Sequence, residues 1–285
     1  MLRRLGLIAG NGRFPFLVLE EARKKGIAVV VAAIKEETFP EIEEYSQSES
    51  GPGVSVHWIG LGQLGKLIRT FKKEKIDKVV MAGQVRHVQI FAPRSAAKRR
   101  RLTALPDLKM WRLLKSLPHK NTESLIAGVA AVLEREGIEL LDSTLLLRDL
   151  LPEAGVLTKR GLTPEEVRDI EYGRPLAREL ARLDLGQTLV VKDQAVVAIE
   201  AMEGTDETIR RAARLVKKQR LTVIKVSRPR QDMRFDVPVV GIDTLGVLGE
   251  CHVSAMAIDA RRTLILDRAQ FIQEADRLGI SLVAG

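Results

Sequence analysis

The feature that most constrains the fold is the alternation, through the first half of the chain, of apolar strand-like runs with helical patterns. Such alternation is typical of βαβ units, which build a parallel sheet. Helices are expected at 14–25, with Pro15 in the first turn and Gly26 at the end, and in a segment that ends near Lys75. The expected strands are 5–9, 27–34, 54–59 and 78–82. The first half is therefore predicted to be a Rossmann-like α/β domain with a parallel sheet.

The second half differs from the first in having shorter strands and hairpin signals. A length of 285 residues exceeds what one average core needs, so two domains are expected. We place the boundary at Glu136, with the Rossmann-like domain at 1–136 and a mixed α/β domain at 137–285. This second domain carries most of the acidic candidate residues described below.

Local patterns predict the elements of the second domain. Thr163 as N-cap, with Glu166 three residues later, predicts a helix that reaches about Leu183. Another helix is expected from about Gly204 to Lys218. The expected strands are a short edge at 157–160 and a hairpin of 188–191 with 195–201.

The composition limits the compartment and the kind of site. The single cysteine, Cys251, excludes an intramolecular disulfide and a multi-cysteine metal site, and it suits a reducing compartment. No signal peptide is visible, because glycines soon break the apolar stretch after Met1, and no apolar run is long enough to cross a bilayer. We therefore expect a cytoplasmic protein.

The charge favours anionic partners. The chain has 46 Lys and Arg against 37 Asp and Glu, a net charge of +9. The densest basic run, 94–101, has almost no interleaved aromatic residues, which argues against single-stranded nucleic acid. We interpret it as a solvated helix surface, with a membrane surface or substrate steering as the alternative.

Two polar runs in the second half point to the chemistry. Run 199–206 places Glu200, Glu203 and Asp206 directly after a strand-like segment, and run 225–236 mixes basic and acidic residues after another. Together they predict a site for a metal and an anionic substrate such as a phosphate ester or anhydride.

A purely structural reading explains part of run 199–206. Thr205 would be the N-cap of the next helix, and Asp206 and Glu207 would balance its dipole. Glu200 and Glu203 precede that helix, and one of them would face the buried side of the strand, where an unpaired carboxylate is costly. A metal, or a cation such as Lys225, would relieve that cost.

Two glycine patterns are candidates for binding phosphate. The run 60–65 matches GxGxxG, but no acid follows the next strand, so helix packing is the preferred explanation and nucleotide binding the alternative. Gly10, Asn11 and Gly12 follow the first strand, and Gln84 follows the fourth. Ligands of open α/β sheets lie at such strand ends, so an anion site and a plain tight turn both remain open.

Several strings of the chain resemble one family. They are 6–12 with Pro15, 184–187, 200–206 and 228–238. They are similar to the LpxI family, the UDP-2,3-diacylglucosamine pyrophosphatases of lipid A synthesis, and the likeness covers nearly the whole chain.

The resemblance implies a hydrolase of lipid A biosynthesis, soluble or peripheral on the inner face of the inner membrane. It would use a divalent cation, Mg²⁺ or another such as Mn²⁺, to cleave the diphosphate of UDP-2,3-diacylglucosamine into UMP and the acylated sugar 1-phosphate. Water would attack the phosphorus on the sugar side, in a cleft between the two domains. No nucleic acid partner is expected, and a homo-oligomer is compatible with the sequence.

The resemblance also selects the site residues. The catalytic and metal-binding set would be Asp232, Glu203 and Asp206, with Asp232 of the Gln-Asp-x-Arg motif the most important and Asp236 its alternative. When the strand-end loops and the basic run are added to the resemblance, the predicted substrate-binding set is Gly10, Asn11, Gly12, Gln84, Gln187, Thr188, Gly204, Thr205, Lys225, Gln231 and Arg234. For Lys225, Arg228 and Arg234, a surface ion pair is the alternative to phosphate neutralisation.

Other features are less informative. Asn121 and Thr122 stand where many relatives carry an acidic pair, which leaves contacts from that loop open. The aliphatic stretches 125–133 and 145–151 could line an acyl-chain groove, although core burial is the default. The four histidines show no metal-ligand spacing. The rival function is a Rossmann-like nucleotide- or dinucleotide-binding protein without hydrolase activity.

Overall fold

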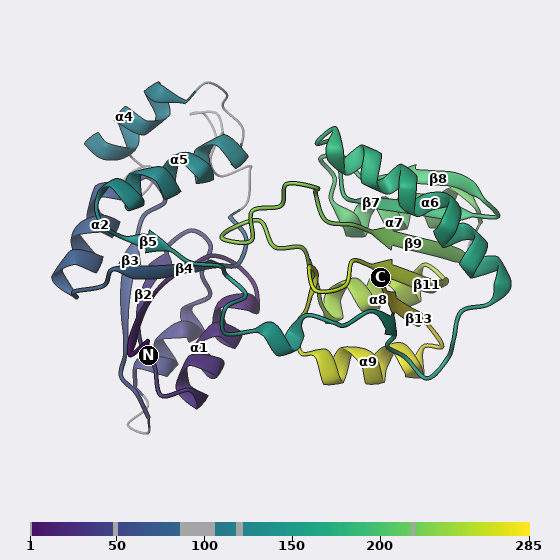
Figure 1. Ribbon diagram of the computed structural model, residues 1–285, viewed down its shortest axis with the longest axis horizontal. Coiled ribbons are helices and arrows are strands. Elements are labelled where there is room, and N and C mark those ends of the chain that lie inside the picture. Colours follow the sequence, from purple (N-terminus) through teal and green to yellow (C-terminus); the bar gives the residue numbers. More distant parts are fainter. Residues whose placement is uncertain (1, 48–50, 86–105, 118–121, 218–219) are drawn as a thin grey trace. The chain divides into compact units, whose positions relative to one another are not determined.

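A computed structural model describes residues 2–47, 51–85, 106–117, 122–217 and 220–285 (Figure 1). The chain divides into two compact units. The first consists of Met1–Leu147 with Met233–Phe235, and the second of Arg148–Asp232 with Asp236–Gly285.

The sheet of the first unit is entirely parallel. Its strands are β1 (Arg4–Ala9), β2 (Ala28–Ile34), β3 (Val54–Ile59), β4 (Lys78–Ala82) and β5 (Glu139–Leu140), in the order β3-β2-β1-β4-β5. The strand β1 lies in the middle of the sheet, with β2 and β3 on one side and β4 and β5 on the other, so the carboxyl ends of β1 and β4 are neighbours. This arrangement confirms the predicted Rossmann-like parallel-sheet domain.

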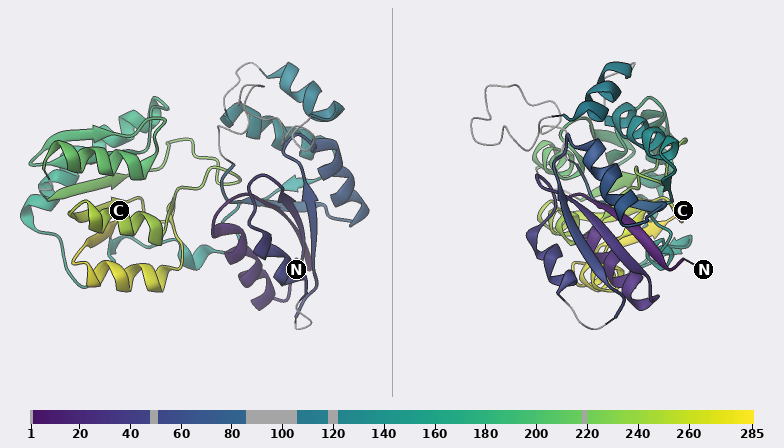
Figure 2. Two further views of the ribbon diagram at one scale, coloured as in Figure 1. Left: turned by 180° about the vertical axis from the view of Figure 1, so that it is seen from behind. Right: turned by 90° about the vertical axis from the view of Figure 1, so that its left-hand side faces the viewer.

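Helices cover both faces of this sheet (Figure 2). They are α1 (Phe14–Lys24), α2 (Leu64–Lys73), α4 (Leu108–Ser116) and α5 (Thr122–Arg135), with a 3-10 helix η1 (Pro40–Ser46). In α2 the buried residues Leu64, Leu67, Ile68 and Phe71 recur at the spacing of one helical face, and this face packs on the sheet together with α5. The helix α1 buries its residues on the other face.

The first unit extends beyond the boundary predicted at Glu136. The two-residue strand β5 pairs in parallel with β4, which keeps the chain in the first sheet after α5. Leu146 and Leu147 are then buried, and the first unit ends at Leu147. The second unit therefore begins at Arg148 rather than at residue 137.

The sheet of the second unit is mixed, as expected. Its strands are β6 (Gly155–Val156), β7 (Thr188–Lys192), β8 (Ala195–Ile199), β9 (Leu221–Lys225), β11 (Val253–Ile258) and β13 (Ser281–Ala284), in the order β6-β13-β11-β9-β7-β8. The three strands β9, β11 and β13 are parallel, while β6 and β7 run antiparallel to their neighbours. A separate parallel pair joins β10 (Val239–Val240) and β12 (Leu264–Ile265).

The helices of the second unit sandwich its sheet. They are α6 (Pro164–Arg182), α7 (Thr205–Leu215), α8 (Ile242–Glu250) and α9 (Arg268–Arg277), with a 3-10 helix η2 (Arg148–Leu150). The helix α6 packs on one face, and α7, α8 and α9 pack on the other. The predicted capping box opens α6, since the Thr163 hydroxyl accepts from the Glu166 N–H while the Glu166 carboxylate accepts from the Thr163 N–H. The edge expected at 157–160 is instead β6, two residues earlier.

Five of the aliphatic candidates for an acyl groove are buried. In 125–133, Leu125, Ala130 and Leu133 are buried in the core of the first unit, and Leu146 and Leu147 are buried in 145–151. Within the described ranges, no helix combines the length and apolar character needed to cross a membrane. The basic run 94–101 lies outside the described residues.

Candidate active site

A group of polar side chains meets at one edge of the second sheet. Because β7 runs antiparallel to both neighbours, its first residue, Thr188, lies beside the ends of β8 and β9. Glu200 follows β8, and Lys225 ends β9. We call these residues, with Gln187 and Thr205, the Lys225 cluster.

Hydrogen bonds connect the Lys225 cluster through the hydroxyl of Thr205. Thr205 Oγ1 accepts from Lys225 Nζ at 2.9 Å and donates to Glu200 Oε1 at 3.0 Å. Thr188 Oγ1 lies 3.2 Å from the same hydroxyl, and the other Glu200 oxygen accepts from the Gln187 N–H at 3.2 Å. The carboxylate that lacked an explanation in sequence is thus linked to a lysine across Thr205.

The conformation at the start of α7 leaves the Thr205 hydroxyl free to bond to Lys225 and Glu200. The expected N-cap was Thr205, but Gly204 holds that position with φ 82° and ψ 169°. This conformation falls in a region that non-glycine residues rarely adopt, so glycine fits it at little cost. Thr205 becomes the first helical residue, and its side chain joins the Lys225 cluster instead of capping the helix.

The electrostatics of the cluster suit an anion. Burial lowers the pKa of the Lys225 ammonium, while Glu200 and Asp206 act in the opposite direction. Gln187 Oε1 is buried without a hydrogen-bond partner among the described residues. A lysine and an unpaired amide beside the first turn of α7 can contact a phosphoryl group and a neighbouring hydroxyl.

The carboxylates of Glu203 and Asp206 are engaged within α7 and α8. Glu203 is exposed, and its own backbone N–H, followed by Arg211 at 2.7 Å, holds its pKa below the usual range. Asp206 Oδ1 accepts from Thr244 Oγ1 at 3.1 Å. Both residues follow the strand end as predicted, but each has a partner there that stabilises the fold.

The run 228–236 forms a loop held by its own side chains. Arg228 pairs with Asp236 at 2.7 Å and with Asp184 at 2.8 Å. Gln231 Oε1 accepts from the Arg228 N–H at 2.6 Å, and Gln231 Nε2 donates to the Asp236 carbonyl. Of the two candidate aspartates, Asp236 therefore neutralises an arginine, and Gln231 orders the loop that presents Asp232.

Arg234 belongs to the first unit. The backbone oxygen of Arg234 accepts from Ser143 Oγ at 2.6 Å, and Phe235 packs on the core of that unit. The Arg234 guanidinium pairs with Glu134 on α5 at 2.7 Å. The structure thus contains the ion pair that was the alternative to phosphate binding at this position.

In the glycine loop of the first unit, the backbone after β1 lies close to the backbone after β4. Asn11 after β1 and Gln84 after β4 exchange backbone hydrogen bonds of 2.7 and 3.1 Å. A Cβ at Gly10 would lie 2.6 Å from the Gln84 oxygen, and one at Gly83 would lie 2.4 Å from the Asn11 oxygen. Both glycines are required by this contact. Gly12, with φ 90°, continues the loop toward α1.

The GxGxxG run is occupied by a carboxylate of the same chain. Asp107 Oδ2 accepts from the Gly65 N–H at 2.6 Å and from the Lys66 N–H at 3.2 Å. These N–H groups at the start of α2 are the ones that would bind the diphosphate of a dinucleotide. Helix packing against Asp107, rather than cofactor binding, accounts for this motif.

The described side chains show whether a three-ligand metal site is already assembled. Across the described part of the chain, no three His, Cys, Asp or Glu side chains gather in a group that could hold an ion. Asp232, Glu203 and Asp206 therefore do not fit a preformed three-ligand site.

The remaining candidates have structural explanations. Cys251 is buried, and burial raises the pKa of its thiol, so it is a poor nucleophile. His57 Nε2 lies 3.5 Å from Glu74. His87, His119 and Asn121 lie outside the described residues, as does the side chain of Thr122. Glu200 is the cluster member missing from the predicted site set, although its place at a strand end was the signal that could have included it.

Comparison with known proteins agrees with the resemblance seen in the sequence. The family model of the LpxI N-terminal domain matches residues 4–150, and that of the LpxI C-terminal domain matches 153–283. The chain is 31% identical over 289 residues to the UDP-2,3-diacylglucosamine pyrophosphatase LpxI of Caulobacter vibrioides, covering 98% of this chain and 96% of the relative. The chain belongs to the LpxI family.

Proposed function

We propose that this protein hydrolyses the diphosphate of UDP-2,3-diacylglucosamine to UMP and 2,3-diacylglucosamine 1-phosphate in lipid A biosynthesis. The similar Caulobacter protein bears the name of this activity and aligns over nearly the full length of both chains. The observation that carries the proposal is the Lys225 cluster, in which a half-buried lysine and hydroxyl-bearing residues meet at a sheet edge. Such a group suits the phosphates and hydroxyls of a nucleotide sugar.

The proposed reaction is a nucleophilic displacement at phosphorus by water. The oxygen of water bonds to the phosphorus on the sugar side, the bond from that phosphorus to the bridging oxygen breaks, and the bridging oxygen leaves with UMP. One water proton is lost to a base or to solvent. Lys225 would neutralise charge on the diphosphate, which otherwise repels the attacking oxygen. Asp232 is the carboxylate that we assign to the reacting centre.

We also propose that the reaction requires a divalent cation, Mg²⁺ or Mn²⁺. Since the described carboxylates form no three-ligand group, we expect the cation to bind through one or two of them together with the substrate. Binding of Mg²⁺ to the free protein should then be much weaker than binding in the presence of the nucleotide sugar.

The assay of UMP release tests this function. Wild-type protein and Asp232→Ala would be incubated with UDP-2,3-diacylglucosamine, with Mg²⁺ or with a chelator. We expect UMP from the wild type with Mg²⁺, little with the chelator, and little from the folded variant. No UMP from folded wild type with Mg²⁺ would exclude this substrate.

Contact with the membrane surface is proposed through α4. Its outer face exposes Leu108 (62%) and Trp111 (47%), one helical turn apart. Arg112 and Lys115 are exposed beside them, and the Lys115 ammonium lies 3.9 Å from the centre of the Trp111 ring. Apolar and aromatic side chains flanked by cations suit the headgroup region of an anionic bilayer. A lipid substrate would be reached from this surface.

A further inference from the structure

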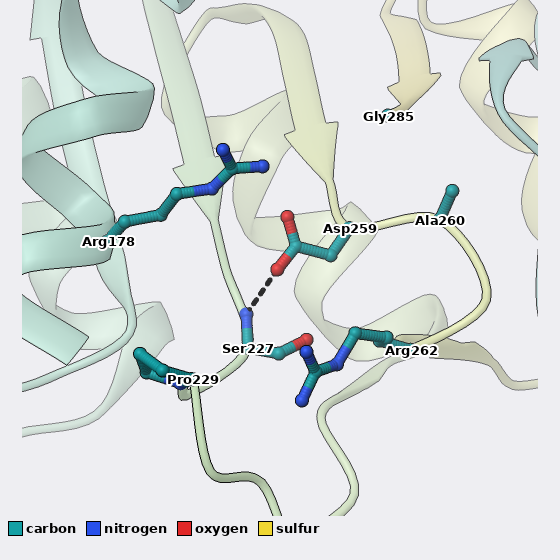
Figure 3. A pocket seen from close by; sticks show the side chains of 7 residues that line it. All are labelled: Arg178, Ser227, Pro229, Asp259, Ala260, Arg262 and Gly285. Carbon is teal, nitrogen blue, oxygen red and sulfur yellow. Dashed lines mark hydrogen bonds between the residues drawn. The ribbon is translucent and has the colours of Figure 1, made fainter. Parts of the chain in front are cut away.

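A pocket of about 290 Å³ opens at the carboxyl ends of β9 and β11. Ser227 follows β9, Asp259 follows β11, and Arg262 lies in the loop after it, while Arg178 reaches in from α6 (Figure 3). Ligands of α/β sheets bind at this end of parallel strands. None of these four residues belongs to the predicted site set.

The pocket contains donors with capacity for a further acceptor. Arg178 forms no hydrogen bond or ion pair with any described residue, and Arg262 bonds to the Arg228 carbonyl at 3.1 Å but to no described carboxylate. Ser227 is 5% exposed, and its hydroxyl has no partner in the described structure. Buried polar atoms are nearly always satisfied, so the Ser227 hydroxyl points to a missing partner. The exposed guanidinium of Arg178 and the half-buried one of Arg262 line the same pocket and are available to an anion there.

The pocket also contains one acceptor with spare capacity. Asp259 Oδ2 accepts from the Ser227 N–H at 2.7 Å (Figure 3). Asp259 Oδ1 is buried without a hydrogen bond, and Arg174 is 3.7 Å away. Arg174 also donates to the carbonyls of Ile258 and Gly285, so its charge is used within the protein. Among the described residues that line the pocket, Arg178 and Arg262 carry the positive charges available to a ligand.

We propose that this pocket binds the nucleotide half of the substrate, with a phosphoryl group on Arg178, Arg262 and the Ser227 hydroxyl, and a ribose hydroxyl on Asp259. The inference rests on the proposed function for the identity of the nucleotide. Guanidinium groups bind phosphate oxygens through paired N–H donors, and a carboxylate accepts from a sugar hydroxyl.

The acylated half of the substrate does not suit this pocket. Among the described residues that line it, only Pro229 and Ala260 contribute apolar side chains, whereas acyl chains need a continuous apolar surface. Its volume is near the lower limit of ordinary ligand pockets, about 300 Å³, which matches a fragment rather than the whole diacylated molecule.

Calorimetric titration with UMP tests the assignment. Wild type, Arg178→Gln and Arg262→Gln would be compared, with Ser227→Ala as a second, smaller change. We expect each arginine variant to raise the Kd for UMP by about tenfold or more, because a charge-assisted contact is lost. Arg182→Gln is the matched control, since Arg182 lies on the same helix, is exposed and pairs with Glu179 at 2.8 Å. It should leave the Kd unchanged.

Two further ligands separate the sources of the phosphoryl group. Uridine should bind weakly and with no dependence on Arg178. Inorganic phosphate should bind more weakly than UMP; equal affinity for the two would overturn the assignment to a nucleotide. An unchanged Kd for UMP in both arginine variants would overturn the pocket itself.

The hydrolysis assay keeps this inference separate from the proposed function. If the wild type hydrolyses UDP-2,3-diacylglucosamine but the Kd for UMP is unchanged in Arg178→Gln and Arg262→Gln, the pocket assignment is wrong and the proposed function stands. If UMP binding depends on both arginines but no hydrolysis occurs, the pocket stands and the function is wrong.

Discussion

At the scale of residues, the second unit holds its charges in two different ways. Arg228 and Arg211 are paired directly with carboxylates. Lys225 instead reaches Glu200 only through the Thr205 hydroxyl, at the edge of the sheet. An indirect pair leaves the ammonium able to bind a further anion, which is why Lys225 is the residue most open to functional test.

Substitution Lys225→Met is expected to lower kcat/KM for UDP-2,3-diacylglucosamine by about 10²-fold or more, as for loss of one preorganised donor to a charged transition state. The variant should fold, because Glu200 keeps its bonds to the Gln187 N–H and the Thr205 hydroxyl. Lys192→Met is the control: Lys192 ends β7 at the opposite edge and pairs with Asp193. Similar kinetics of both variants would contradict the role of Lys225.

At the scale of elements, the strands β1 to β4 of the first unit were predictable and the two-residue strands were not. Strands β3 and β4 have the predicted bounds. In β3 the apolar residues Val54, Val56 and Trp58 alternate with polar ones, and in β4 four apolar residues follow Lys78. The two-residue strands β5 and β6 carry no periodic pattern, so the domain boundary and the edge at 157–160 were misplaced. Their positions depend on pairing with distant strands, which local propensity does not encode.

The candidate site was predictable in part for the same reason. Acids and glycines at strand ends indicated Lys225, Thr205 and Gln187, which the structure brings together at one edge of the sheet. Sequence alone did not show that Asp107 would occupy the GxGxxG loop from 42 residues away, or that Gly204 would displace Thr205 as N-cap. The pocket of Arg178 and Arg262 also needs tertiary packing, since α6 and the loop after β11 are far apart in sequence.

The packing of α6 on the sheet gives a test of the second unit. A Cβ at Gly173 would lie 2.4 Å from Ile224 Cδ1 and 2.7 Å from Val191 Cγ2. Gly173→Ala should therefore lower the free energy of unfolding by about 1–3 kcal/mol through overpacking. Gly246→Ala in α8 meets no atom within 4 Å and should raise it by about 0.5–1 kcal/mol. Urea unfolding measures both, and equal effects would show that α6 does not pack as described.

The stabilisation that Glu136, at the end of α5, gains from lysines on α2 and α4 should be lost at acid pH. Hydrogen bonds from Lys109 on α4 and Lys72 on α2 lower the pKa of Glu136 from 4.5 to about 2. Because the folded-state pKa is the lower one, the stabilisation is complete above about pH 4.5 and is lost as the pH falls toward 2.

Glu136→Gln should lower the free energy of unfolding at pH 7 and flatten the decline of that free energy between about pH 4.5 and 2. Glu139→Gln, at an exposed carboxylate 4.0 Å from Lys78, is the control. Identical pH profiles of wild type and Glu136→Gln would refute this account.

At the scale of the whole molecule, a net charge of +9 and the exposed face of α4 favour an anionic surface. The chain has two tryptophans, so Trp58→Phe leaves Trp111 as the only one. Emission of this variant should shift to the blue with anionic phosphatidylglycerol vesicles, less with neutral ones, and less at high salt. The reciprocal variant, Trp111→Phe, should show no shift. A shift in Trp58 instead, or none in either variant, would exclude α4 as the contact.

The proposed reaction adds water to the sugar-side phosphorus of UDP-2,3-diacylglucosamine. The most direct measurement is a single-turnover reaction in ¹⁸O-labelled water with Mg²⁺, followed by mass spectrometry of both products. One ¹⁸O atom is expected in 2,3-diacylglucosamine 1-phosphate and none in UMP. Label in UMP would place the attack on the other phosphorus, and the absence of both products would contradict the proposed hydrolysis.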